Sequence, residues 1–252
     1  MVSIDQIKEL RERTGISMTV CKKALEEVGG DMNAAIDLLR KKGEAKAVER
    51  GDRDAGEGRV AIAGTDQKKA MILLACETDF VARSEECAKA AQGFAERVLV
   101  EGVDVDLSGE VADMGIQLGE KIEIKGKVIF EGPMIGAYIH SNNKIGVLVN
   151  LSGGSAEQGK DVAMHTAATK PDCVSPDQMD ADLVEHEKGI WREQLVAEGK
   201  PAEIMDKIMM GKERKFCEDG ALISQPFVKN PDQTVGQYLG DVVVNDFVLF
   251  QV

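Results

Sequence analysis

Glu77-Thr78-Asp79-Phe80-Val81-Ala82-Arg83 stands where the chain changes from a strand pattern to a helix pattern. The residues before it, 70–76, are apolar throughout and have the length and composition of a buried strand. A helical pattern follows, from Ser84 to about Glu101. We therefore expect the segment to form a strand-to-helix loop, where binding residues concentrate because a rigid scaffold positions them.

Phe80 in this loop has two interpretations. It could fold back as a core anchor while Asp79 bonds to loop amides. It could instead project as a probe aimed at another molecule, next to a carboxylate and near Arg83. The residues alone support both interpretations equally.

The same stretch belongs to a strand–turn–strand–helix unit. Residues 59–63 and 69–76 flank a polar turn and predict a hairpin, and the helix from Ser84 follows it. Apolar residues then alternate with polar ones over 122–130, which predicts a further strand. We assign residues 51–135 to a first core subdomain.

A second unit of the same order follows. Residues 136–140 and 145–151 flank Ser141-Asn142-Asn143-Lys144, a favourable hairpin turn, and lead into a helix over 155–169. The repeat predicts an α+β fold with a duplicated core, each half an antiparallel sheet with helices on one face. The second subdomain is assigned residues 136–179 and 220–252, with strands at 221–228 and 246–252.

Residues 1–50 are predicted to form a compact bundle of three helices. Ser3 and Gln6 have the spacing of a capping box at the first helix, and the third helix is expected to end near Gly43. Three short helices on brief turns are typical of the ubiquitin-associated type, a binding module without room for an active site. A glycine- and charge-rich linker at 44–59 follows.

Residues 180–219 break the strand pattern again. Asp182–Glu198 and Ala202–Phe216 are helical segments joined across Gly199-Lys200-Pro201. Their apolar positions are sparse, so we expect a helical hairpin that protrudes from the core.

Composition excludes several functional classes. The 252-residue chain has a net charge of −13, which disfavours direct nucleic-acid binding and anionic membranes and suits a basic protein surface. Its five cysteines are widely spaced without any CxxC, which is typical of reduced thiols in a cytoplasmic protein. No apolar run approaches the roughly 20 residues of a membrane span, and we expect no signal peptide.

One segment resembles a phosphate-binding loop. Residues 154–160 match the pattern GxxxxGK, but Asp161 stands where Ser or Thr would hold magnesium. A capping box of Ser155 with Gln158 explains the segment more simply. No Ser, Cys or His shows a paired base or metal-ligand spacing. We expect no cofactor, no metal site and no enzymatic bond chemistry.

Four short motifs occur in order along the chain. They are Leu10-Arg11 with Thr14-Gly15, Met18 and Cys21–Leu25; Thr78-Asp79-Phe80-Val81; Met164-His165 with Ala167-Ala168 and Lys170-Pro171; and Gly211-Lys212 with Lys215-Phe216 and Gln225–Val228. Together they resemble the elongation factor Ts family. The resemblance covers almost the whole chain and is strong because the order matches as well as the motifs.

The resemblance implies a guanine nucleotide exchange factor for elongation factor Tu, bound in its GDP-bound and nucleotide-free forms. In this family the loop matching Thr78, Asp79, Phe80 and Val81 inserts beside the partner's nucleotide and helps to dislodge magnesium. The bundle docks on the partner's G domain, and the core contacts that domain and the third domain. A dimer or a 2:2 complex is compatible with the family's helical hairpin. The further partner contacts implied are Met18, Lys22, His140 and Val228.

Two alternatives remain at this point. The bundle could tether a different partner in a non-exchanging interaction adaptor, which deletion of residues 1–50 would reveal. A P-loop nucleotidase is the third hypothesis, and it requires that the isolated protein bind ATP or GTP.

Overall fold

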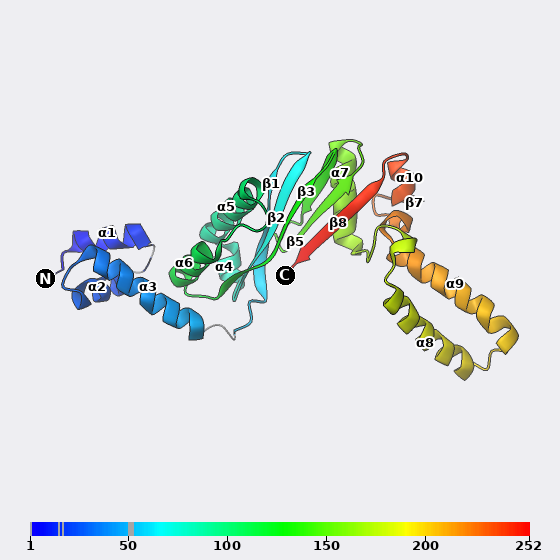
Figure 1. The fold of residues 1–252 in the computed structure, drawn as a ribbon, viewed down its shortest axis with the longest axis horizontal. Coiled ribbons are helices and arrows are strands. Elements are labelled where there is room, and N and C mark those ends of the chain that lie inside the picture. The colour runs from blue at the N-terminus through cyan, green and yellow to red at the C-terminus, as the bar shows by residue number, and fades with distance from the viewer. Residues whose placement is uncertain (1, 15, 17, 50–52) are drawn as a thin grey trace. The chain divides into compact units, whose positions relative to one another are not determined.

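The computed structural model describes residues 2–14, 16, 18–49 and 53–252. Contacts divide the chain into two units. The first comprises Met1–Ala63, Ala70–Val128 and Gln251–Val252, and the second comprises Gly64–Lys69 and Ile129–Phe250. Both mix helices with small sheets, so the α+β class is confirmed (Figure 1). The four-segment division from the sequence is finer than these two units and stays a prediction.

The first unit begins with the three-helix bundle. Ser3 and Gln6 form the expected reciprocal bonds at the first helix, at 3.0 and 3.1 Å. The third helix does not end near Gly43; it continues to Glu49, because the residues that follow Gly43 include the strong helix formers Glu, Ala and Lys. The helices are α1 (Ile4–Thr14), α2 (Met18–Glu27) and α3 (Met32–Glu49). Their shared core consists of Ile7, Leu10, Cys21, Ala24, Leu25, Ala35 and Leu39.

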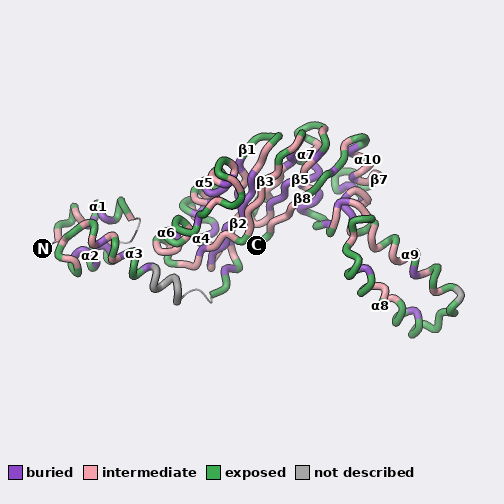
Figure 2. Tube along the Cα trace, in the orientation of Figure 1, coloured by how far each residue is buried: buried purple, intermediate pink, exposed green. Residues whose placement is uncertain are grey.

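The first unit also contains three helices and most of a three-stranded sheet. The strands, in sheet order, are β1 (Glu57–Gly64), β2 (Lys68–Cys76) and β3 (Ile122–Glu131). The helices are α4 (Asp79–Arg83), α5 (Glu85–Glu101) and α6 (Ser108–Leu118). Strand β2 is buried continuously from Ala70 to Cys76, as its apolar run predicts (Figure 2). Helix α6 was not predicted, because Gly109 and Gly115 weaken its helical signal.

The second unit contains the second hairpin. Strands β4 (Met134–Ile139) and β5 (Ile145–Leu151) pair antiparallel, and β8 (Val244–Gln251) lies on the other side of β5. The predicted hairpin and last strand are thus confirmed. The turn is closed by the His140 N–H, which donates to the Ile145 carbonyl at 2.9 Å.

Helix α7 (Ala156–Thr169) packs closely on β4. Two facing glycines allow the approach: a Cβ on Gly136 would lie 2.2 Å from the carbonyl oxygen of Gly159. Ser155 and Gln158 form the expected capping box. Capping and packing therefore account for the segment that resembles a phosphate-binding loop, and Gly159 serves helix–sheet contact.

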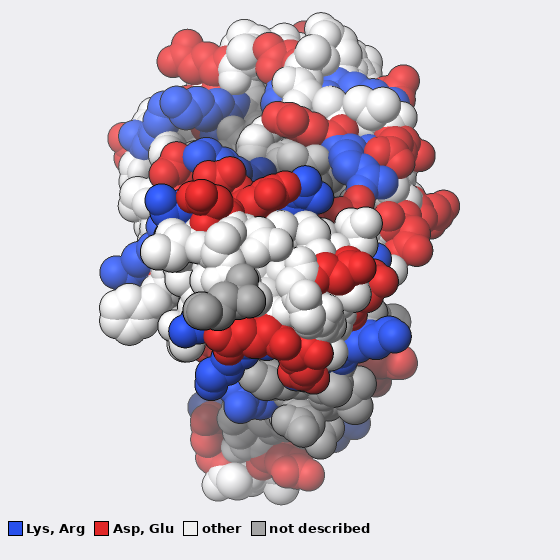
Figure 3. Space-filling view, turned by 90° about the vertical axis from the view of Figure 1, so that its left-hand side faces the viewer, with Lys and Arg blue, Asp and Glu red and all other residues white. Residues whose placement is uncertain are grey.

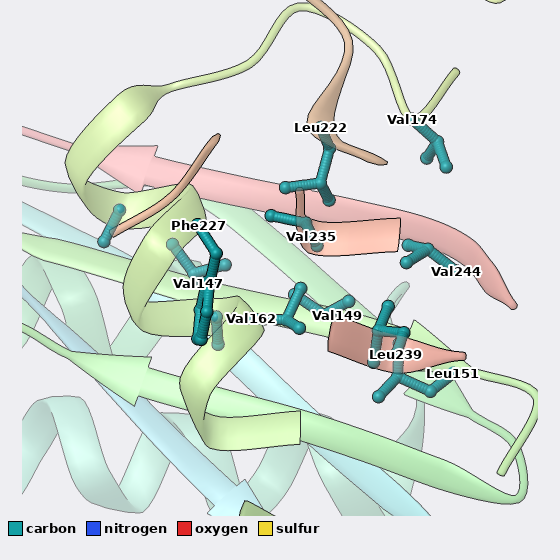
Figure 4. Packing of buried hydrophobic residues seen from close by; sticks show 12 residues of the cluster. Val147, Val149, Leu151, Val162, Val174, Leu222, Phe227, Val235, Leu239 and Val244 are labelled. Atoms are coloured by element: carbon teal, nitrogen blue, oxygen red, sulfur yellow. The ribbon is translucent and has the colours of Figure 1, made fainter. Parts of the chain in front are cut away.

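The core of the second unit joins the sheet and α7 to the segment after residue 220 (Figure 4). The predicted strand at 221–228 is wrong. Leu222–Ser224 is a 3₁₀ turn (η2), Pro226–Phe227 (β6) pairs with β7 (Asn230–Thr234), and Ala221 makes an isolated β-bridge to Cys173. Pro226 lacks the N–H that a longer ladder needs, and the apolar residues serve the core instead. The members of this core are Val147, Val149, Leu151, Val162, Ala163, Ala167, Val174, Leu222, Phe227, Val235, Leu239 and Val244.

The predicted helical hairpin is present. Its helices are α8 (Ala181–Ala197) and α9 (Ala202–Gly220). Trp191 meets Phe216 edge to face at a ring separation of 5.6 Å, and Lys188 pairs with Glu213 at 2.7 Å. Helix α9 contacts two short turns of its unit, η1 (Pro176–Gln178) and η2. The short helix α10 (Val235–Leu239) was not predicted; Thr234 and Gln237 cap it reciprocally.

Candidate functional site

The corner between β2 and α4 carries the residues singled out in the sequence. The segment after Asp79 is a single helical turn rather than an open loop. Thr78 is its N-cap, in an extended conformation, and its hydroxyl accepts from the Val81 N–H at 3.4 Å. Ser84 ends this turn and caps α5 by accepting from the Cys87 N–H at 3.1 Å. Two N-caps, Thr78 and Ser84, with the five residues of α4 between them, thus produce a sharp step between two helices.

Phe80 points away from the core. Its exposed fraction is 84%, whereas Ala82, two residues on, is 6% exposed. A one-turn helix places residues two apart on opposite sides, so Ala82 anchors the turn and Phe80 projects from it. Phe80 is therefore not a core anchor. Its role as a probe stays a prediction.

Asp79 is held only loosely. Its carboxylate pairs with Arg83 at 3.2 Å, and the two side chains are 42% and 77% exposed, respectively. An exposed pair on one helical turn stabilises by only about 0.3–0.5 kcal/mol. Asp79 can therefore leave Arg83 for another cation at little cost.

Glu120 fixes the corner from the start of β3. Its Oε2 accepts from the backbone N–H groups of Glu77 at 3.1 Å and Thr78 at 3.0 Å, and its Oε1 accepts from the Thr78 hydroxyl at 2.5 Å. Sequence reasoning does not single out this residue, because it lies 42 residues from Thr78. Only its position just before an alternating strand could have suggested it.

Glu77 and Arg59 add further ties to the corner. Glu77 accepts from the Lys121 N–H at 2.6 Å and pairs with Arg53 at 2.9 Å. Arg59, on β1, donates to the Ala82 carbonyl at 3.3 Å. Both ends of α4 are thus attached to the sheet.

The thiols beneath the corner are not nucleophiles. Burial, with smaller contributions from the neighbouring Cys87 and Glu120, raises the pKa of Cys76 to about 12. Burial also raises the pKa of Cys87. Because the thiolate is the reactive form, both groups act as packing residues.

In the second unit, His165 orders the tract that contains Val228. The Val228 N–H donates to His165 Nδ1 at 3.2 Å, so the neutral ring carries its proton on Nε2, which donates to Gln225 Oε1 at 3.0 Å. Phe227, the residue before Val228, is buried and stacks on Tyr238 at a ring separation of 4.3 Å. Val228 itself is 41% exposed. The sequence motifs around His165 and Val228 are therefore one structural unit.

We expect the His165 ring to make stability depend on pH. Burial lowers its pKa below the usual value near 6.5. The unfolded chain then binds the proton more tightly than the folded chain does. The contribution of the neutral ring to the free energy of unfolding is therefore complete above about pH 6.5, and it is lost as the pH falls through the lower pKa of the folded state. The free energy of unfolding should therefore fall as the pH is lowered below about 6.5.

Urea titrations at several pH values measure this dependence. The variant His165→Gln should show a flatter pH profile than the wild type, and His186→Gln, at an exposed histidine on α8, should match the wild type. Equal profiles for all three proteins would assign the pH dependence to other groups.

The remaining predicted contacts lie on separate elements. In the bundle, Met18 is half-buried and Lys22 is exposed, with a 3.7 Å ion pair to Glu26. In the second unit, His140 is exposed at the end of β4, where its Nδ1 lies 3.1 Å from the Tyr138 hydroxyl. The structure thus brings Thr78, Asp79, Phe80 and Val81 together but does not join the other predicted residues to them.

Surface chemistry agrees with the acidic composition. On the face seen in Figure 3, the lysines and arginines of the described residues are interspersed with carboxylates and form no continuous basic area. Within the described ranges, no three His, Cys, Asp or Glu side chains are grouped to hold a metal ion. None of the helices in the part of the chain that the structure describes combines the length and apolar composition needed to cross a membrane.

Fold and site define an α+β protein with a small helical bundle, two sheet-and-helix units and an apolar side chain presented on a capped turn. The family described as Elongation factor TS matches residues 77–252, more than half of the chain. The Elongation factor Ts of Halorhodospira halophila is 44% identical over 253 residues, covering 94% of this chain and 87% of that protein. That of Deinococcus radiodurans is 41% identical over 261 residues, covering 99% of each. The chain belongs to the elongation factor Ts family.

Proposed function

We propose that this protein is the guanine nucleotide exchange factor of elongation factor Tu in the cytoplasm. It binds the GDP-bound partner, promotes the release of GDP, and holds the nucleotide-free form until GTP enters. The observation that carries the proposal is the exposed Phe80 on a turn whose two ends are tied to the sheet. An exposed phenylalanine gains free energy only when another surface covers it.

The two central residues act differently in this proposal. Phe80 enters an apolar slot between helices of the partner, and its burial supplies the free energy for distorting that site. Asp79 arrives with it and disturbs the polar shell around the magnesium ion. The weak pair with Arg83 leaves the Asp79 carboxylate available for this step.

Loss of magnesium explains why GDP leaves. The cation offsets the negative charge of the diphosphate, and it is the largest local charge in such a site. Without it, the phosphates are held less tightly. Coupling between sites is reciprocal, so a nucleotide that rebinds with magnesium weakens the hold of this protein by the same factor. No covalent bond is made or broken by residues of this chain.

Four further residues are proposed to contact the partner outside the α4 corner. We place Met18 and Lys22 of the bundle on the partner's G domain, following the family resemblance. His140 and Val228 supply contacts from the second unit. The exposure of Lys22, His140 and Val228 supports these assignments, since a contact residue must be reachable.

A mixing experiment tests the proposal at equilibrium. GDP-loaded elongation factor Tu is incubated with this protein, and the complex is isolated by gel filtration and assayed for nucleotide. The expected complex contains no GDP and dissociates when GTP and magnesium are added. A complex that retains one GDP for each elongation factor Tu would support the non-exchanging adaptor instead.

A further inference from the structure

We propose that Glu120 is a positioning residue of the exchange site, which sets the direction in which α4 presents Phe80. The inference rests on the proposed exchange function. Glu120 is not a contact residue in this account, because it acts through Thr78. Its carboxylate ties together the end of β2, the N-cap of α4 and the start of β3.

The first step of the argument is the number of bonds made by one carboxylate. Glu120 accepts three hydrogen bonds, two from backbone N–H groups and one from a hydroxyl. Two of the donors belong to Thr78, the N-cap of α4. Hydrogen bonds to a charged acceptor are stronger than neutral ones. The corner therefore has a fixed geometry relative to β3.

The second step is the orientation of the cap. The Thr78 hydroxyl donates its proton to Glu120 Oε1, which leaves an oxygen lone pair to accept from the Val81 N–H at 3.4 Å. A glutamine at position 120 would either point its amide NH₂ donor at the Thr78 hydroxyl or no longer bond to that hydroxyl. Glu120 thus determines the hydroxyl orientation that caps the turn.

The third step is the weakness of the turn by itself. Helix α4 has five residues and few internal hydrogen bonds, among them Ala82 N–H to the Thr78 carbonyl at 3.1 Å. Isolated helices far shorter than about 12 residues are not stable in water. External attachments therefore decide where Phe80 points, and holding it in one direction lowers the ordering cost on binding.

Labelled-GDP release at saturating factor tests the inference with a double-mutant cycle of Glu120→Gln and Phe80→Ala. We expect Glu120→Gln alone to lower the maximal release rate about tenfold, the effect of losing one charge-assisted interaction. In the Phe80→Ala background the same change should lower the residual rate less than about twofold, because the two residues act as one unit.

Glu123→Gln is the matched control. Glu123 lies on β3 three residues beyond Glu120 and pairs with Lys121 and Lys125, and none of the hydrogen bonds to the corner comes from it among those the structure describes. Glu123→Gln removes the same charge three residues further along the chain and should leave the release rate unchanged.

Amide hydrogen exchange separates positioning from general stability. Glu120→Gln and the isosteric Thr78→Val should both speed exchange at residues 81–84 and leave the β2 amides protected. Loss of protection in β2 as well, or equal effects of Glu120→Gln in both backgrounds, would overturn the inference. If the wild type does not accelerate GDP release at all, the proposed function fails; if only Glu120→Gln is without effect, this inference alone fails.

Discussion

Phe80→Ala is expected to remove most of the acceleration of GDP release while leaving the fold unchanged. The side chain is 84% exposed, so truncation creates no cavity, and surface changes of this kind alter stability by less than about 0.5 kcal/mol. In the complex the same ring is expected to fill a slot. Truncating such an anchor costs about 2 kcal/mol or more, which is about thirtyfold in rate if the slot forms on the way to release.

Stopped-flow release of labelled GDP and thermal unfolding measure the two quantities. Val100→Ala is the control, because Val100 on α5 is also highly exposed, at 83%, and has no proposed contact. Phe80→Ala should differ from Val100→Ala in exchange and match it in stability. Unfolding of Phe80→Ala, or unaltered exchange, would contradict the assignment of Phe80.

Phe227→Ala should have the opposite effect to Phe80→Ala: it should lower stability and leave the GDP-release activity of the folded protein unchanged. Phe227 is 2% exposed, stacks on Tyr238 and lies 6.0 Å from the His165 ring, so its removal leaves a cavity in the second core. Truncation of a buried phenylalanine costs about 3–5 kcal/mol. The second unit should unfold at a lower denaturant concentration than in the wild type. The rate of GDP release should fall only in proportion to the fraction of protein that is folded.

Hydrogen exchange resolved by segment measures this effect, since the two units need not unfold together. Protection should fall in β5 and α7 and remain in β2 and α5. Phe227→Leu, which keeps most of the side-chain volume, should lose much less of this protection than Phe227→Ala. Equal loss of protection in both units would show that the Phe227 core does not belong to the second unit alone.

Local patterns predicted the regular parts of this fold. The apolar run at 70–76, the turn at 141–144 and the capping box at Ser155 each reflect short-range chemistry, and each is present. The strand prediction for 221–228 was wrong because of tertiary packing. Leu222 and Phe227 are apolar because they enter the core of the second unit, and this produces an apolar pattern like that of a strand.

The candidate site was predictable only in part. Asp79 and Phe80 stood out because their types are unusual together after a buried strand. The partners that hold the corner could not be predicted, because Glu120 and Arg59 reach it from parts of the chain far away in sequence. For the same reason the bond from Val228 to His165, 63 residues away, has no signal in local spacing.

The most direct test of the account is the release of labelled GDP from elongation factor Tu, with and without an equimolar amount of the wild-type protein, at millimolar magnesium. The account predicts much faster release with the protein present, and a smaller additional effect once a chelator has already removed the magnesium. An unchanged release rate, in a mixture where gel filtration shows the two proteins bound, would contradict it.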